Sequence, residues 1–191
     1  MHKRLLFVAF LAFLLASCTR EREKPHAAAA VGRSEAATGS IPRGITGAEV
    51  GMTPLQIGQI FTVREDQDPV AMLLKKYGKP AEAEAVSRQN KAVQERFFRI
   101  SSGVGKLPGG VASADARATH DVVFAIGLHY DEASDKKIGW AGVAYPYVAK
   151  YGKPSEDTGT GYVWKDGRTR LSIEASGAQI NVFFVDEALE T

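Results

Sequence analysis

The chain lacks most of the features from which a function is usually read. Its 191 residues include one cysteine and no marked excess of either charge. Because Cys18 has no partner, a disulfide within the chain is excluded, and the fold must be stable through its core alone. Basic residues number 24 and acidic residues 22, without the basic stripe that nucleic acids require. We therefore predict no nucleic-acid partner.

A transmembrane run is also missing. The longest apolar run covers the eleven residues from Leu5 to Leu15, directly after Lys3 and Arg4. As a helix it would rise about 16 Å, roughly half the hydrocarbon thickness of a bilayer. A positive start, a short apolar core and small residues behind it are typical of a secretory signal peptide. Residues 1–17 are predicted to be that signal, and without it the chain is formally neutral.

The end of this run is more specific than an ordinary signal. Leu15-Ala16-Ser17-Cys18 resembles the lipobox of bacterial lipoproteins, an aliphatic residue and two small residues followed by cysteine. The resemblance implies that Cys18 becomes the first mature residue and carries two or three acyl chains, enough for a stable membrane anchor. In that family Thr19, because it is not aspartate, implies transfer to the outer membrane. The alternative is a plain secreted protein with an incidental cysteine.

The residues after the cysteine have the composition of a linker. Small and charged side chains from residue 18 to 44 cannot bury enough apolar surface to form a core, so we predict a flexible tether there. A random coil of this length would span about 28 Å and a fully extended one about 90 Å. Residues 45–191 are enough for one folded domain.

Two short helices are predicted at the start of this domain. Thr53 and Pro54 have the preferences of an N-cap and a first helical residue. Asp68 should cap a second helix over residues 69–77, which Gly78 and Pro80 would end.

The stop signal of the second helix occurs twice. Lys76-Tyr77-Gly78-Lys79-Pro80 returns as Lys150-Tyr151-Gly152-Lys153-Pro154, an offset of 74 residues. We interpret this as a degenerate two-fold repeat, with halves at about 45–130 and 131–191. Tyr77 and Tyr151 are predicted to pack each helix end on the sheet.

Alternating apolar residues and turn signals predict an antiparallel sheet. The expected strands cover residues 93–100, 122–129, 137–145, 161–164, 168–174 and 179–185, and Asp166-Gly167 forms a hairpin turn between two of them. Residues 101–119 are predicted to be a glycine-rich loop. The fold class is therefore α+β, with short helices packed on an antiparallel sheet.

The segment Glu49-Val50-Gly51-Met52-Thr53-Pro54-Leu55-Gln56-Ile57 adds a second resemblance. It is similar to the start of the first helix in BamE/SmpA-type outer-membrane lipoproteins, and the same start opens each half of the duplicated β-lactamase-inhibitor fold. The resemblance implies two short helices on an antiparallel sheet, and binding of proteins through the sheet or its loops.

The sequence contains no recognisable set of catalytic residues. Cys18 is committed to lipid, so no thiol nucleophile remains. His120 and His129 are followed by Asp121 and Asp131, but a metal or acid–base site would need these groups to converge across a hairpin. We predict no catalytic residues, no metal and no cofactor.

One loop is a candidate for partner binding. The segment from Gly103 to Gly110 is rich in glycine but lacks the spacing of a phosphate-binding loop. Exposed loops on a small scaffold often hold partners. The candidate residues are Gly103, Gly105, Lys106, Leu107 and Pro108.

The sequence thus predicts a lipid-anchored protein of the outer membrane that faces the periplasm and binds another envelope protein without catalysis. An inhibitor or immunity lipoprotein directed against a periplasmic enzyme is the first alternative. An envelope enzyme with a site near His129 is the second.

Overall fold

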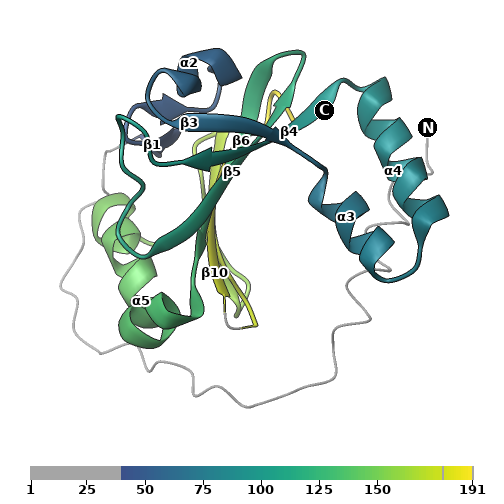
Figure 1. Cartoon of the computed structure of the whole chain (residues 1–191). Coiled ribbons are helices and arrows are strands. Elements are labelled where there is room, and N and C mark those ends of the chain that lie inside the picture. Colours follow the sequence, from purple (N-terminus) through teal and green to yellow (C-terminus); the bar gives the residue numbers. More distant parts are fainter. Residues whose placement is uncertain (1–39, 178, 191) are drawn as a thin grey trace. The chain divides into compact units, whose positions relative to one another are not determined.

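The computed structural model describes residues 40–177 and 179–190, without the side chains of residues 132–138. The fold is α+β, as predicted (Figure 1). The helices are α2 (Pro54–Gly58), α3 (Pro69–Lys76), α4 (Pro80–Ala92) and α5 (Glu132–Tyr151). The strands are β1 (Gly44–Ile45), β2 (Ala48–Glu49), β3 (Thr62–Asp66), β4 (Glu95–Ser101), β5 (Val111–Thr119), β6 (Val122–Tyr130), β7 (Glu156–Asp157), β8 (Gly161–Lys165), β9 (Thr169–Ser176) and β10 (Gln179–Asp186).

Eight of the strands form one antiparallel sheet in the order β3-β4-β5-β6-β10-β9-β8-β7. Across the sheet the first four strands follow chain order and the last four follow it in reverse, and the two groups meet where β6 pairs with β10. The groups divide between Tyr130 and Glu132, at the boundary drawn between the predicted halves. Duplication itself stays a prediction.

The residue pairing that suggested the repeat holds at the helix ends and in one strand, because the offset of 74 places β4 on residues 169–175, which lie in β9. Gly78 and Gly152 both have positive φ (72° and 75°), the conformation of a glycine that ends a helix. Beyond them, residues 80–92 form α4, whereas the matching residues 154–166 form β7 and β8. The constant offset of 74 therefore matches the helix ends and the strands β4 and β9, but it fails in the segment between them.

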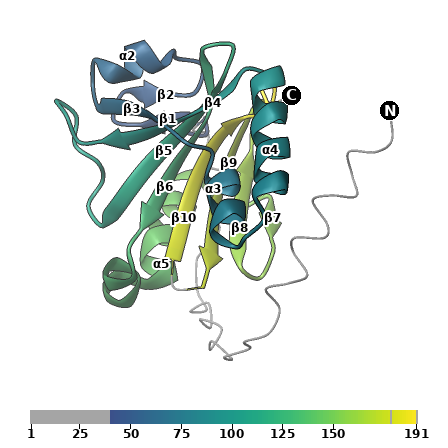
Figure 2. The same cartoon turned by 45° about the vertical axis from the view of Figure 1, so that its right-hand side comes forward.

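The main core lies on one face of the sheet, and a smaller buried cluster is formed by Phe124, Ala125 and Val185. Apolar side chains at every second position of the central strands, such as Ile126, Leu128 and Val182, are buried against α5. Figures 1 and 2 show α5 on this side of the sheet and α3 with α4 on the other. Trp164 is buried and Trp140, Tyr147, Tyr151 and Tyr162 pack partly buried against the core. No helix of the described residues has the length and apolar character needed to span a bilayer.

Both predicted helix starts are confirmed. The Thr53 hydroxyl accepts a hydrogen bond from the Gln56 amide, and the Gln56 side chain accepts one from the Thr53 amide, which completes a capping box. Asp68 accepts hydrogen bonds from the amides of Val70 and Ala71 at the start of α3.

Three expectations need correction. Pro80 does not only end α3 but begins α4, because proline suits the first turn of a helix. Residues 111–119 form β5 rather than a loop, with Ala114, Ala116 and Ala118 buried on one face. Residues 137–145 lie in α5 rather than in a strand.

Ordered packing begins before residue 45, where the domain boundary was placed. Ile41 is buried in the core, and Arg43 donates to Asp186 (Nη2–Oδ2 2.7 Å) and to Thr169 (Nη1–Oγ1 3.1 Å). Arg168 also donates to the fully buried Asp186 (Nε–Oδ2 2.8 Å). The boundary therefore moves to Ile41. The predicted signal (1–17), Cys18 and the tether up to residue 39 lie outside the described residues.

Candidate functional site

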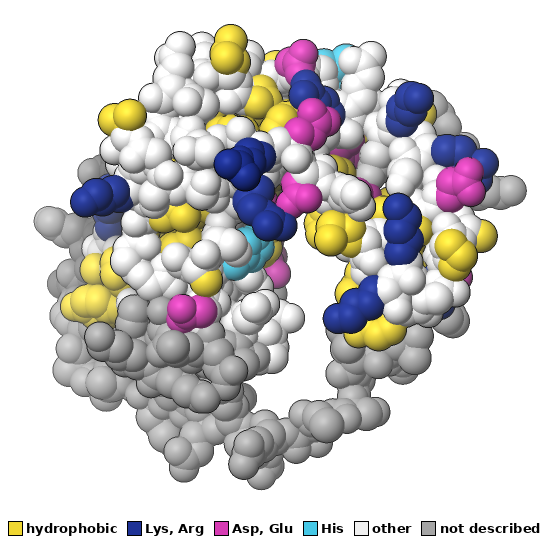
Figure 3. All heavy atoms as spheres, in the orientation of Figure 1, with side chains coloured by type: hydrophobic (Ala, Val, Ile, Leu, Met, Phe, Trp, Pro, Cys, Tyr) yellow, Lys and Arg dark blue, Asp and Glu magenta, His cyan; other side chains and the backbone are white. Residues whose placement is uncertain are grey.

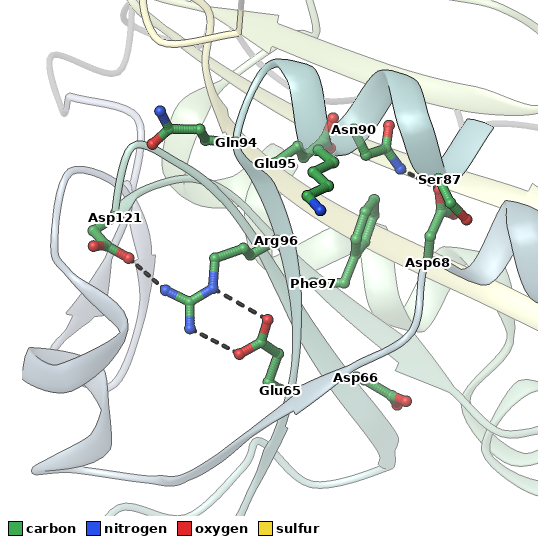
Figure 4. Close-up of a pocket in the computed structure, with 11 residues that line it drawn as sticks. Glu65, Asp66, Asp68, Ser87, Asn90, Gln94, Glu95, Arg96, Phe97 and Asp121 are labelled. Atoms are coloured by element: carbon green, nitrogen blue, oxygen red, sulfur yellow. Dashed lines mark hydrogen bonds and ion pairs between the residues drawn. The ribbon is translucent and has the colours of Figure 1, made fainter. Parts of the chain in front are cut away.

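Two adjoining grooves, each of about 600 Å³, lie at the end of β3 and β4 beside the β5–β6 turn. They share three side chains: Glu65 from β3, Arg96 from β4 and Asp121 from the turn. Figure 4 shows the first groove, with Arg96 between the two carboxylates. Arg96 thus stands where the grooves meet.

Arg96 is held from two sides. It donates to Glu65 through Nε (3.2 Å to Oε1) and Nη2 (2.8 Å to Oε2), and to Asp121 through Nη1 (2.5 Å to Oδ1). Its guanidinium also lies 5.0 Å from the ring centre of Phe98. The hydrogen bond from Arg96 lowers the pKa of Glu65, and the same bond raises the pKa of Arg96. The pair therefore stays ionised at neutral pH.

The backbone around these grooves is unusual. His120 and Asp121 have φ of 51° and 60°, as a two-residue hairpin turn requires. Gln94, which lines the first groove, has φ of 53°. Non-glycine residues seldom adopt positive φ, and when they do they are often found at functional sites. Three of the four such residues in the described chain gather here.

The first groove is acidic, but its carboxylates are already engaged. Five carboxylates and two basic side chains line it, a formal charge of −3, and the two arginines outside the lining that pair with it reduce this to −1. Besides Glu65 and Asp121, Asp66 pairs with Arg99, Glu95 pairs with Arg117, and Asp68 caps α3 and accepts from Asn90. None of these groups is positioned as an unpaired acid or base. What the groove offers is a negative surface with fixed side chains.

A second polar cluster lies on the sheet face opposite the core. His129 contacts Asn181 through Nδ1 (2.7 Å to Oδ1) and Asp115 through Nε2 (2.5 Å to Oδ2). The bond to Asp115 raises the pKa of His129, against the opposing effect of burial. Gly127 leaves room for this pair, because a Cβ there would lie 2.7 Å from Asp115 Oδ1. The contact with Asp115 within the sheet therefore favours the protonated form of His129.

The two histidines considered for an active site are far apart. His120 lies in the turn before β6 and His129 near the other end of β6, so roughly 25–30 Å of strand separates them. Among the described side chains, the hydrogen-bond partners of His129 are Asp115 and Asn181, which belong to the neighbouring strands β5 and β10. Within the described residues no three metal-ligating side chains gather.

The predicted partner loop is held in place by its own bonds. The Gly103 amide donates to the Gly105 carbonyl (2.9 Å), and the Gly105 amide donates to the Ile60 carbonyl (2.6 Å). Gly103 and Lys106 are exposed, whereas Gly105, Leu107 and Pro108 are half-buried. The loop also carries Val104, which sequence reasoning did not select and which is 92% exposed, the highest value among the exposed large hydrophobic residues of the described chain.

Sequence reasoning also missed the Arg96 grooves. The two carboxylate partners of Arg96, Glu65 and Asp121, lie 31 and 25 residues away from it in the chain. The one local signal was that Arg96, Phe98 and Ile100 occupy every second position of β4 and so share one face of the strand. Such spacing predicts a strand but not its neighbours.

Comparison of the chain with protein families, curated proteins and solved structures finds no match. The site therefore has to be interpreted from its own geometry.

Proposed function

We propose that this is a lipid-anchored protein of the cell envelope that binds another protein without catalysis. Acyl chains on Cys18 would hold it to the periplasmic side of the outer membrane. The observation that carries the binding role is the first Arg96 groove, an open acidic surface whose carboxylates are all engaged in ion pairs or caps. Fixed ion pairs suit recognition better than acid–base chemistry, which needs a group free to exchange a proton.

The charge of the groove indicates its partner. The lining has more carboxylates than basic groups, a formal charge of −1 when the paired Arg99 and Arg117 are counted, and this is complementary to a basic segment of an envelope protein. The ion pairs already fix the groove side chains and the β5–β6 turn is already formed, so these groups need not be ordered when a partner binds. This lowers the entropy cost of binding.

Photo-crosslinking in cells tests this proposal. A photoreactive residue in place of Lys91, which lines the groove, should give a discrete crosslinked species in the membrane fraction. The matched control is Lys165, an exposed lysine on β8. Asp121→Asn, which removes a groove charge at a position asparagine tolerates, should weaken the crosslink. Equal crosslinking from both lysines, or none from Lys91, would contradict the proposal.

A specific observation supports the inhibitor alternative. The loop from Ser102 to Gly110 presents an exposed Val104 between two backbone bonds, one of them to Ile60. A pre-shaped apolar tip is the kind of element that can enter an active site. For an inhibitor, Val104→Asp should abolish partner binding while Asp121→Asn leaves it unchanged.

A further inference from the structure

The helix α3 leaves an apolar face uncovered. Eight large hydrophobic side chains of the described residues are exposed, and four of them belong to α3 or its C-terminal cap: Val70, Met72, Leu73 and Tyr77. Tyr77, which was predicted to pack a helix end on the sheet, is 69% exposed. That prediction is wrong.

The spacing of these residues forms a stripe. Val70, Leu73 and Tyr77 follow one another at intervals of three and four, so they lie on one side of the helix. The opposite side holds Ala71, the only buried residue of α3, and α4 buries only Ala83. Small residues and the Asp68–Asn90 bond connect the two helices, while Val70, Leu73 and Tyr77 remain 45–69% exposed.

The charged residues of α3 itself and of the turn that follows it are all positive. From Pro69 to Lys79 the chain has three lysines and no acidic residue. Lys79 pairs with Glu82, but Lys75 and Lys76 have no carboxylate partner among the described residues. Figure 3 shows hydrophobic and basic side chains next to one another over α3 and α4. An apolar stripe flanked by lysines is typical of helices that lie in a membrane interface.

We propose that α3 contacts an anionic phospholipid surface, with Val70, Leu73 and Tyr77 inserted and with Lys75 and Lys76 at the headgroups. The positive flank complements anionic lipid. A surface this small binds weakly alone, so the contact rests on the proposed anchor at Cys18 to keep the membrane close.

The length of chain before the fold allows this contact. From Cys18 to Ser40 there are 22 residue steps, which span at most about 75 Å. A domain of about 150 residues has a radius of gyration of about 15 Å. Because any face of the domain is within reach of the anchor, the chemistry of its surface decides which face meets the lipid.

The first experiment measures binding without the anchor. All described elements lie between Gly44 and Asp186, so a chain of residues 18–191 with Cys18→Ser contains the whole fold. It should co-float with vesicles of phosphatidylcholine and phosphatidylglycerol in equal parts, and not with phosphatidylcholine alone. Lys75→Gln and Lys76→Gln should each lower the partition coefficient about fivefold. Tyr77→Gln should also lower it, whereas the matched control Tyr145→Gln, 72% exposed on α5, should not.

The second experiment restores the anchor and locates the contact. Cys18 is the only thiol, so the chain of residues 18–191 can be coupled through it to maleimide-bearing lipid in the same vesicles. Amide hydrogen exchange of residues 70–77 should slow on the anionic vesicles relative to the uncharged ones, and Lys75→Gln with Lys76→Gln should remove the difference.

The inference is overturned if the coupled chain shows no charge-dependent protection of α3, or if the α3 variants co-float as well as the parent. Protection of α3 by a protein from the envelope in the absence of lipid would also overturn it, in favour of a protein-docking face. The proposed lipid anchor is tested independently of the α3 contact, and it is refuted if Cys18 in cells carries no acyl group.

Discussion

Removal of the Asp186 carboxylate should be among the more damaging single changes to this fold. Asp186 is fully buried and accepts hydrogen bonds from Arg43, Arg168 and the Ala188 amide. It joins the start of the fold, the β8–β9 turn and the end of β10. The proposed anchor precedes Arg43, so a pull from the membrane would pass through this contact.

The magnitude follows from what is lost. Three hydrogen bonds at about 1 kcal/mol each give about 3 kcal/mol for Asp186→Ala. The usual cost of breaking a buried pair is about 3–5 kcal/mol, and the low end applies because Arg43 and Arg168 are partly exposed and regain water. For a domain of this size, 3 kcal/mol lowers the melting temperature by about 6–12 °C.

The assay is urea unfolding beside thermal unfolding, with Glu187→Gln as the control. Glu187 neighbours Asp186 but makes an exposed pair with Arg170, so its loss should cost less than about 1 kcal/mol. Burial alone would raise the pKa of Asp186, but hydrogen bonds from Arg43 and Arg168 outweigh it and hold the pKa below its usual value. The stabilisation is therefore present above the unfolded pKa of about 3.9 and lost as the pH falls through the folded pKa. If Asp186→Ala costs no more than Glu187→Gln, the reasoning is refuted.

Three further predictions concern the other contacts. Because Asp115 raises the pKa of His129, the pair stabilises the fold below the unfolded pKa of histidine, about 6.5, and this stabilisation is lost as the pH rises through the folded pKa. Urea unfolding from pH 5 to 9 should show the loss of stability, and His129→Gln should remove this pH dependence. Gly105→Ala should destabilise by about 1–3 kcal/mol, because its Cβ would lie 2.7 Å from Ile60 Cγ2; a wild-type melting temperature would contradict this. Arg96→Met should cost less than about 1 kcal/mol, because its ion pairs are exposed; a larger loss in urea unfolding would make Arg96 a structural residue rather than a groove residue.

Local signals in the sequence predicted local structure well. Thr53 with Pro54, and Asp68 with Pro69, fixed two helix starts because their capping chemistry is contained within a few residues. The strand starting at Gln179 was predicted by its alternation alone.

The errors arose where one signal had two meanings. Pro80 can follow a helix or begin one, and the matching Pro154 suggested the first, although the alanines and glutamates after Pro80 favour a helix. In β5 the buried face consists of alanines, which have a low strand propensity, so the alternation was hidden among small residues. The Arg96 grooves could not be predicted, because their three shared side chains come together only through strand pairing.

The central claim is the lipid anchor at Cys18, and the most direct measurement is the mass of the N-terminal peptide of the mature protein isolated from cell envelopes. We predict a peptide that begins at Cys18 and carries a diacylglyceryl group with an acylated amine. A peptide that begins elsewhere, or an unmodified Cys18, would contradict the account of anchor and location, while the contacts of Asp186 and Arg96 would stand.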